Sequence, residues 1–232
     1  MMMLYILVGL VTMALGLMAS AYVKSRFHHY SRIPGSSGYT GAQAAAEILR
    51  RNGITEVTIH EHQGFLGDHY DPLHRRLVLS PDVYHGTSLA ALGVAAHEAG
   101  HAIQHKKAYA PLHLRMAAVG ATNFANQIVT WLPLLGIGSG LMSGQVGLGI
   151  MAAGWGVIML FNLITLPVEY DASRRAKEML AKLGFVRTQE EGAGVAAVLN
   201  AAALTYVAAF VTSLLYLLLF LLPLLLGGRS RD

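Results

Sequence analysis

Long apolar runs alternate with polar segments along the chain, and this pattern predicts a protein that crosses a membrane several times. The apolar runs cover residues 3–23, 116–138, 146–168 and 195–226. Each is long enough to cross the bilayer core as a helix, which takes about 20 residues. The expected fold class is therefore mainly α, a polytopic membrane protein with about four transmembrane helices and a small α+β subdomain.

The same pattern divides the chain into five segments. These are an N-terminal transmembrane anchor (1–23), a polar subdomain (24–115), a transmembrane hairpin (116–168), a polar segment that begins with a basic helix (169–194) and a C-terminal transmembrane helix (195–232). A cleaved signal peptide is the alternative for the first segment. We favour an anchor, because the segment has no basic start and is followed directly by Lys24, Arg26 and Arg32.

The composition agrees with a membrane protein and excludes several classes of site. Hydrophobic residues make up 54% of the chain and charged residues 13%, whereas soluble domains average about 25% charged residues. There is no cysteine, so disulfides, thiolate metal sites and a cysteine nucleophile are excluded. The net charge of +4 does not indicate nucleic-acid binding here, because the basic residues flank the apolar runs as membrane topology requires.

Capping signals mark the ends of two helices outside the apolar runs. Thr40 with Gln43 forms a capping box for a helix that ends before Gly53. Thr188 with Glu191 forms a second capping box, ahead of the last apolar run.

Two strands and a third helix are expected in the polar subdomain. Short β-branched or aliphatic runs at residues 57–59 and 77–79 predict the strands, and Asp71-Pro72 marks a turn between them. Thr87 or Ser88 then caps a helix that continues to about residue 107.

That last helix carries the candidate chemistry, the sequence His97-Glu98-Ala99-Gly100-His101. Histidines four residues apart share one helix face, where two imidazoles can bind one tetrahedral Zn²⁺ and leave a position open for water. Glu98 lies beside them and can take a proton from that water. The pattern predicts His97 and His101 as metal ligands, Glu98 as the catalytic base and Zn²⁺ as the cofactor. The alternative is a buried helix with two hydrogen-bonded histidines.

The motif helix is too short and too polar at its end to be a membrane span. Only about nine residues separate Ser88 from His97, and Lys106-Lys107 closes the helix, whereas a span takes about 20 apolar residues. We therefore expect the metal at the membrane surface or just below it.

A third ligand must come from elsewhere in the chain, because a two-histidine site needs one more protein ligand. His105 is excluded by geometry, since it lies about 12 Å from His97 along a straight helix. Residues 102–168 contain no Asp or Glu, and the first carboxylate after them is Glu169, where the hairpin returns to the motif's side. Glu169 is the predicted ligand, and Asp171 is the second choice or a group that orients a ligand histidine.

Charge distribution predicts which side of the membrane carries the motif. Fifteen of the 17 Lys and Arg residues lie in segments 24–115 and 169–194, which four spans place on one side. The positive-inside rule assigns that side to the cytoplasm. We expect a multi-pass protein of the cell membrane with its active site on the cytoplasmic side, in contact with the lipid bilayer and with a peptide or membrane-protein substrate. Association with a second copy or an accessory membrane protein stays open.

Two segments and the long hairpin carry a resemblance to a known family. The motif at 97–101 and the sequence Pro-Val-Glu-Tyr-Asp-Ala-Ser-Arg-Arg-Ala at 167–176 resemble the YugP-type membrane neutral zinc metallopeptidases over nearly the whole chain. At longer range the chain is similar to the gluzincin membrane peptidases, which include the heat-shock membrane proteases and the CAAX prenyl endopeptidases. The resemblance implies His97 and His101 as zinc ligands, Glu98 as the base and Glu169 as the third ligand.

The chain departs from the longer-range relatives at one position. They carry an Asp four residues after the glutamate ligand, where this chain has Ser173. The carboxylate behind the ligands is therefore in question, and Asp171 is the candidate to replace it.

The resulting hypothesis is a membrane-embedded zinc-dependent endopeptidase that hydrolyses peptide bonds of membrane proteins or peptides at the cytosolic face. An extended substrate would pair with the strand at 77–79. The residue that stabilises the oxyanion stays open among Tyr170, His74, His105, Arg174 and Arg175.

Two other functions are weighed against this hypothesis. One is a non-catalytic membrane assembly, chaperone or metal-binding protein, in which the metal would be handled by His60, His62, His69 and His74. The other is a metal-dependent hydrolase of lipids or lipid-linked substrates.

Overall fold

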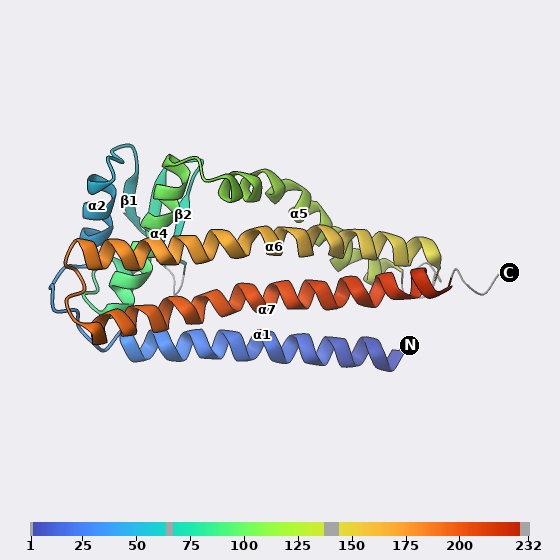
Figure 1. The fold of residues 1–232 in the computed structure, drawn as a ribbon. Coiled ribbons are helices and arrows are strands. Elements are labelled where there is room, and N and C mark those ends of the chain that lie inside the picture. Colours follow the sequence, from blue (N-terminus) through green and yellow to red (C-terminus); the bar gives the residue numbers. More distant parts are fainter. Residues whose placement is uncertain (1, 64–66, 137–143, 228–232) are drawn as a thin grey trace. The chain divides into compact units, whose positions relative to one another are not determined.

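The computed structural model describes residues 2–63, 67–136 and 144–227, and in this part of the chain it contains seven helices and one three-stranded sheet (Figure 1). The mainly helical class is confirmed. The expected hairpin turn at 138–143 lies outside the described residues. The elements in chain order are α1 (Met2–Tyr30), α2 (Gly41–Arg51), β1 (Thr58–Glu61), β2 (His69–Asp71), β3 (Arg76–Leu79), α3 (Pro81–Tyr84), α4 (Leu89–Lys106), α5 (Ala110–Leu135), α6 (Gln145–Lys182) and α7 (Gln189–Gly227).

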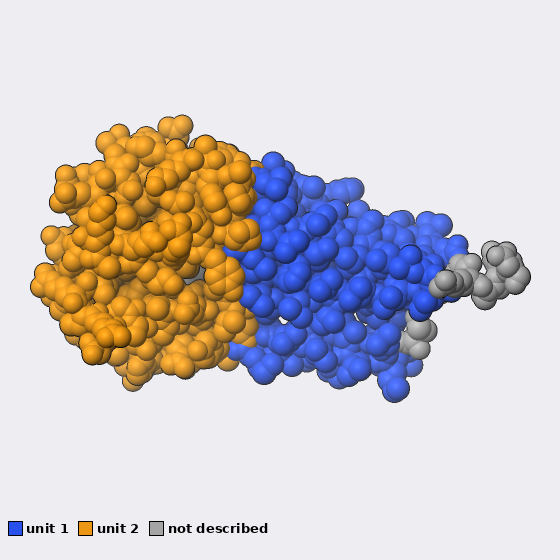
Figure 2. Space-filling view, viewed as in Figure 1, with its two compact units in different colours: residues 1–18, 114–166, 206–232 blue, residues 19–113, 167–205 orange. Residues whose placement is uncertain are grey.

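The chain forms two compact units, which Figure 2 shows in different colours. Unit 1 consists of the described residues of Met1–Met18, Leu114–Leu166 and Tyr206–Asp232, and unit 2 consists of those of Ala19–His113 and Pro167–Thr205. Four helices, α1, α5, α6 and α7, therefore contribute residues to both units, and unit 2 contains the whole sheet and α4.

Three helices in the described part of the chain are long and apolar enough to cross a membrane, namely α1, α6 and α7. Helix α5 is not among them, because Asn123, Asn126 and Gln127 lower the hydropathy of its middle. Helices α6 and α7 are also longer than expected. Helix α6 continues through Pro167 into the basic segment, so Glu169 lies inside a continuous helix and not at the start of a new one.

Unit 1 presents large apolar side chains outward and has a polar contact between two of its helices. Leu17 on α1, Leu160 on α6 and Leu225 on α7 are each more than half exposed. Exposed leucines on long apolar helices are typical of a surface that contacts lipid. Between α6 and α7, the Asn162 amide donates to the Ser213 hydroxyl (Nδ2···Oγ 3.1 Å). An amide inside unit 1 thus finds its partner on a neighbouring helix, as polar groups in membrane proteins commonly do. Among the described residues, the buried indole N–H of Trp155 on α6 has no such partner.

Unit 2 confirms the predicted caps. The Thr40 hydroxyl accepts from the Gln43 N–H (3.2 Å), and the Gln43 side chain accepts from the Thr40 N–H (3.0 Å). Thr188 and Glu191 make the same reciprocal pair ahead of α7. Of the two candidates for the motif helix, Ser88 is the cap, because its Oγ accepts from the N–H of residue 91 (3.2 Å).

The sheet of unit 2 has the strand order β1-β3-β2, with β1 parallel and β2 antiparallel to β3. The predicted strands are β1 and β3, whereas β2, with the sequence His-Tyr-Asp, has no apolar signal of its own. Because β3 is the central strand, both of its edges are already hydrogen-bonded. The expectation that residues 77–79 pair with a substrate is therefore wrong.

Helix α4 lies at the centre of the core of unit 2. Leu92, Ala95, Ala96 and Ala99 on this helix are completely buried, together with Ile48 of α2. Small alanine side chains allow neighbouring elements to approach α4 closely, which fixes the position of the helix that carries the motif.

Candidate metal centre

The two motif histidines lie one turn apart in the second half of α4. The ring centroids of His97 and His101 are 4.8 Å apart, and the ring planes are nearly perpendicular. Both side chains are about nine-tenths buried. The four-residue spacing thus brings the imidazoles together on one helix face, as the sequence predicts.

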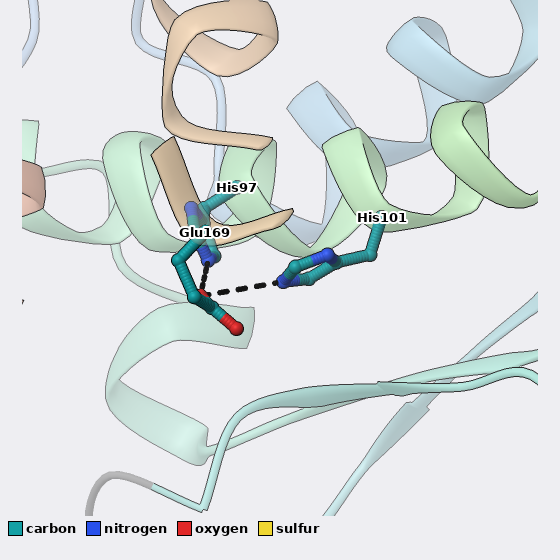
Figure 3. A group of neighbouring side chains, drawn as sticks. All are labelled: His97, His101 and Glu169. Carbon is teal, nitrogen blue, oxygen red and sulfur yellow. Dashed lines mark hydrogen bonds and ion pairs between the residues drawn. The ribbon is translucent and has the colours of Figure 1, made fainter. Parts of the chain in front are cut away.

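Helix α6 brings Glu169 directly against these rings. Its Oε2 lies 3.2 Å from His97 Nε2 and 3.7 Å from His101 Nε2, and the glutamate is only 2% exposed (Figure 3). The approach depends on Gly100, since a Cβ at this position would lie 2.8 Å from the backbone oxygen of Ala172 on α6. A residue without a side chain therefore allows the backbones of α4 and α6 to come close enough for this arrangement.

These three side chains could hold a metal ion. One ligand atom from each of His97, His101 and Glu169 lies within 4.8 Å of the others, and this is the one such group found among the described residues. Two imidazoles and one carboxylate, with a position left for water, are a donor set that suits catalytic zinc. The histidines at 60, 62, 69 and 74 do not form a comparable group in the described part of the chain.

Hydrogen bonds behind the cluster determine which ring nitrogen of a neutral His101 carries the proton. The Gln104 amide nitrogen donates to the Val168 carbonyl oxygen (2.8 Å) and to Asp171 Oδ2 (2.9 Å). Its Oε1 must therefore accept, and it lies 3.0 Å from His101 Nδ1. With the Nδ1–H donating to Gln104, the lone pair of a neutral His101 is on Nε2, the nitrogen that faces Glu169.

Ser173 takes the equivalent place behind the other histidine. Its Oγ lies 3.1 Å from His97 Nδ1, and the serine is 5% exposed. The resemblance to the longer-range relatives implies a carboxylate at this position. In this chain a neutral hydroxyl contacts the His97 ring instead.

Asp171 lies outside the three-residue cluster. The cluster therefore contains Glu169, the predicted ligand, and not Asp171, the alternative. Its carboxylate accepts from Gln104, from Arg175 Nε (2.6 Å) and from Arg174. It therefore reaches His101 only through Gln104, the residue that sequence analysis missed. The sequence signal that could have pointed to Gln104 is its position three residues after His101, because side chains at this spacing are neighbours on a helix.

Glu98 lies beside the cluster and is held by the sheet. It is 8% exposed, and its Oε2 accepts from the backbone N–H of Tyr70 in β2 (3.0 Å). Burial raises the pKa of Glu98, since a low-dielectric environment disfavours the charged form. For His101, burial lowers the pKa, but the hydrogen bond to Glu169 raises it, and the net pKa is raised.

The candidates for oxyanion stabilisation are mostly engaged elsewhere. His105 is bonded to the Tyr70 hydroxyl (2.8 Å) and His74 to Asp71 (2.7 Å). The other candidates are Arg174 and Arg175, which both pair with Asp171, and Tyr170, which is 51% exposed. The geometry singles out none of the five.

A buried H-E-x-x-H helix, a glutamate from a second helix and long apolar helices define a membrane metallopeptidase. The family model described as "Putative neutral zinc metallopeptidase" matches residues 5–224, and the chain belongs to this family. It is 44% identical to the "Putative membrane protease YugP" of Bacillus subtilis (strain 168), over 99% of this chain and 100% of that protein. No solved structure matches the chain.

Proposed function

We propose that the chain is a membrane-embedded zinc endopeptidase that cleaves membrane proteins or peptides close to the cytosolic surface. The observation that carries the proposal is the convergence of His97, His101 and Glu169 within 4.8 Å. In this proposal the three residues hold the zinc ion, and Glu98 is the catalytic base.

The surroundings of the cluster suit a site that keeps one cation in one position. Ser173 and Gln104 contact the Nδ1 atoms of the two rings, and both Nε2 atoms face Glu169 Oε2. A bound zinc ion would lower the pKa of a water molecule and polarise the scissile carbonyl group.

Glu98 performs the proton transfers in this scheme. The Tyr70 N–H holds its Oε2, and Oε1 takes a proton from the attacking water. The water oxygen bonds to the carbonyl carbon, and Glu98 then passes the proton to the leaving amine as the C–N bond breaks. The raised pKa of Glu98 makes its carboxylate a stronger base, which favours the uptake of the proton from the water.

A membrane position for unit 1 and a cytosolic position for unit 2 complete the proposal. Basic residues gather in the segments that form unit 2, and the positive-inside rule places such segments in the cytoplasm. Four spans give this topology, with α5 as the fourth. Support for α5 comes from its packing against the membrane-spanning part of α6, where a Cβ at Gly154 would lie 2.8 Å from Val129 Cγ1.

The catalytic part is tested with the purified full chain in detergent. Wild type should contain one zinc per chain and cleave a quenched fluorescent peptide library, and a chelator should abolish both. Glu98→Gln should keep zinc and lose cleavage by a factor of about 10³ or more, whereas His97→Ala should lose zinc as well. Glu47→Gln, on the surface of α2, is the matched control that should change neither. Cleavage by Glu98→Gln would remove Glu98 as the base.

The topology is tested with single cysteines, which is practical because the chain has none. Leu73 is 82% exposed in unit 2. A Leu73→Cys variant should react with a membrane-impermeant maleimide only after the cells are permeabilised. Labelling in intact cells would place the site outside the cytoplasm.

A further inference from the structure

The polar side chains of unit 1 fall into two groups. Inside the unit, Asn162 is paired with Ser213. On α5 the amides of Asn123, Asn126 and Gln127 are exposed instead. Within the described residues, the one hydrogen bond seen for these three amides joins Gln127 Oε1 to the indole N–H of Trp131 on the same helix (2.9 Å).

These amides lie at the depth of the membrane span and not in water, in the proposed four-span topology. The opposite face of α5 carries Thr122 and Ala125, which are buried, and packs at Val129 against Gly154 of α6. Large apolar side chains flank the amides on the outward face, where Phe124 is 70% exposed. Amides exposed to hydrocarbon are costly and are usually bonded to another helix.

The outward residues follow a regular spacing along the helix. Gly120, Asn123, Gln127 and Thr130 are all exposed and are separated by three, four and three residues; we refer to them as the α5 seam. Alternating spacings of three and four residues are the pattern of a helix that packs along its length against another helix. A Cβ added at Gly120 meets nothing within 4 Å, so a second backbone has room to approach there.

We propose that the α5 seam is the surface through which a second copy of this chain binds within the bilayer. Copies of one chain insert in the same direction, so their α5 helices run parallel. In a parallel pair, residues on the seam face their own counterparts. Asn and Gln carry both a donor and an acceptor, so Asn123 can pair with Asn123 of the second copy, and Gln127 with Gln127.

The test is disulfide crosslinking in native membranes with the full chain. Gly120→Cys and Thr130→Cys should each give an oxidant-dependent dimer of this chain. Leu160→Cys, at a position on α6 that is 52% exposed, is the matched control and should give several-fold less. The double change Asn123→Leu with Gln127→Leu should lower the Thr130→Cys dimer yield several-fold and leave zinc content unchanged, which shows that unit 2 still folds.

Several results would overturn the inference. Equal yields at positions 120 and 160, or a yield that the leucine pair does not change, would exclude the α5 seam as the contact. If a seam cysteine crosslinks to a substrate or to another membrane protein, and not to a second copy of this chain, that protein is the partner that binds the α5 seam. Rapid labelling of Thr130→Cys by an impermeant maleimide would place α5 in water. None of these readouts involves peptide cleavage, so they are independent of the proposed enzymatic function.

Discussion

Gln104 joins His101 to Asp171: its Oε1 lies 3.0 Å from His101 Nδ1, and its Nε2 lies 2.9 Å from Asp171 Oδ2. Gln104 is completely buried, and it also bonds the Val168 carbonyl oxygen on α6. One side chain thus orients a motif histidine and ties α4 to the helix that carries Glu169.

Removal of this link should weaken metal binding. Gln104→Leu removes the acceptor for His101 Nδ1–H and should lower zinc affinity by about 10–100-fold, as loss of such supporting contacts does. Gln104→Glu keeps an acceptor for the ring but loses both donated bonds, so it should bind zinc with intermediate affinity. Competition with a chromophoric chelator measures both. Unchanged affinity in Gln104→Leu would show that His101 needs no such support.

Ser173 should matter for the same reason at the other ring. Ser173→Ala removes the oxygen 3.1 Å from His97 Nδ1 and should lower zinc affinity by about 10-fold. Ser173→Asp restores an acceptor, and a charged one makes a stronger hydrogen bond, so this variant should recover affinity relative to alanine. If the two variants bind zinc equally, the hydroxyl does not orient the ring.

Gly100 should tolerate no side chain. In Gly100→Ala, the new Cβ would lie 2.8 Å from the Ala172 backbone oxygen, so α4 and α6 must move apart. We expect a loss of about 1–3 kcal/mol in stability and a marked loss of zinc. Gly149→Ala on α6 is the control, because a Cβ there meets nothing within 4 Å. Thermal unfolding in detergent and zinc content distinguish the two; equal behaviour would mean that the helix contact is not tight.

The turn after β2 should contribute stability in a pH-dependent way. Burial raises the pKa of Asp71, but hydrogen bonds from His74 and Arg76 lower it to about 2, below its ordinary 3.8. A lowered carboxyl pKa stabilises the fold above pH 3.8, and this stabilisation is lost as the pH falls towards 2. Asp71→Asn should therefore have a lower Tm than wild type at pH 7, and the difference should shrink below pH 4. A difference that is constant with pH would contradict the assignment.

The local features of the site could be predicted from the sequence. The spacing of His97 and His101 fixes their common face, and the predicted cap at Thr87 or Ser88 places the start of α4 to within one residue. The absence of any carboxylate between residues 102 and 168 leaves Glu169 as the nearest candidate, and the structure places it beside both histidines.

The features that sequence analysis missed depend on contacts between distant segments. Strand β2 has a polar sequence and exists because it pairs with β3, so local propensity could not reveal it. The hydrogen bond from Tyr70 to Glu98 follows from that pairing. The partners of Gln104 lie on α6, 64 and 67 residues away, and no local pattern identifies them.

The division of the cluster between α4 and α6 has a consequence for biosynthesis. His97 and Glu169 are 72 residues apart in the chain, so at typical rates of synthesis the glutamate follows the histidine by roughly 4 to 14 s. A nascent chain that has exposed its motif helix still lacks the third side chain of the cluster. Under the proposed function, the metal site is therefore complete only after α6 has been synthesised, and the motif helix alone is inactive until then.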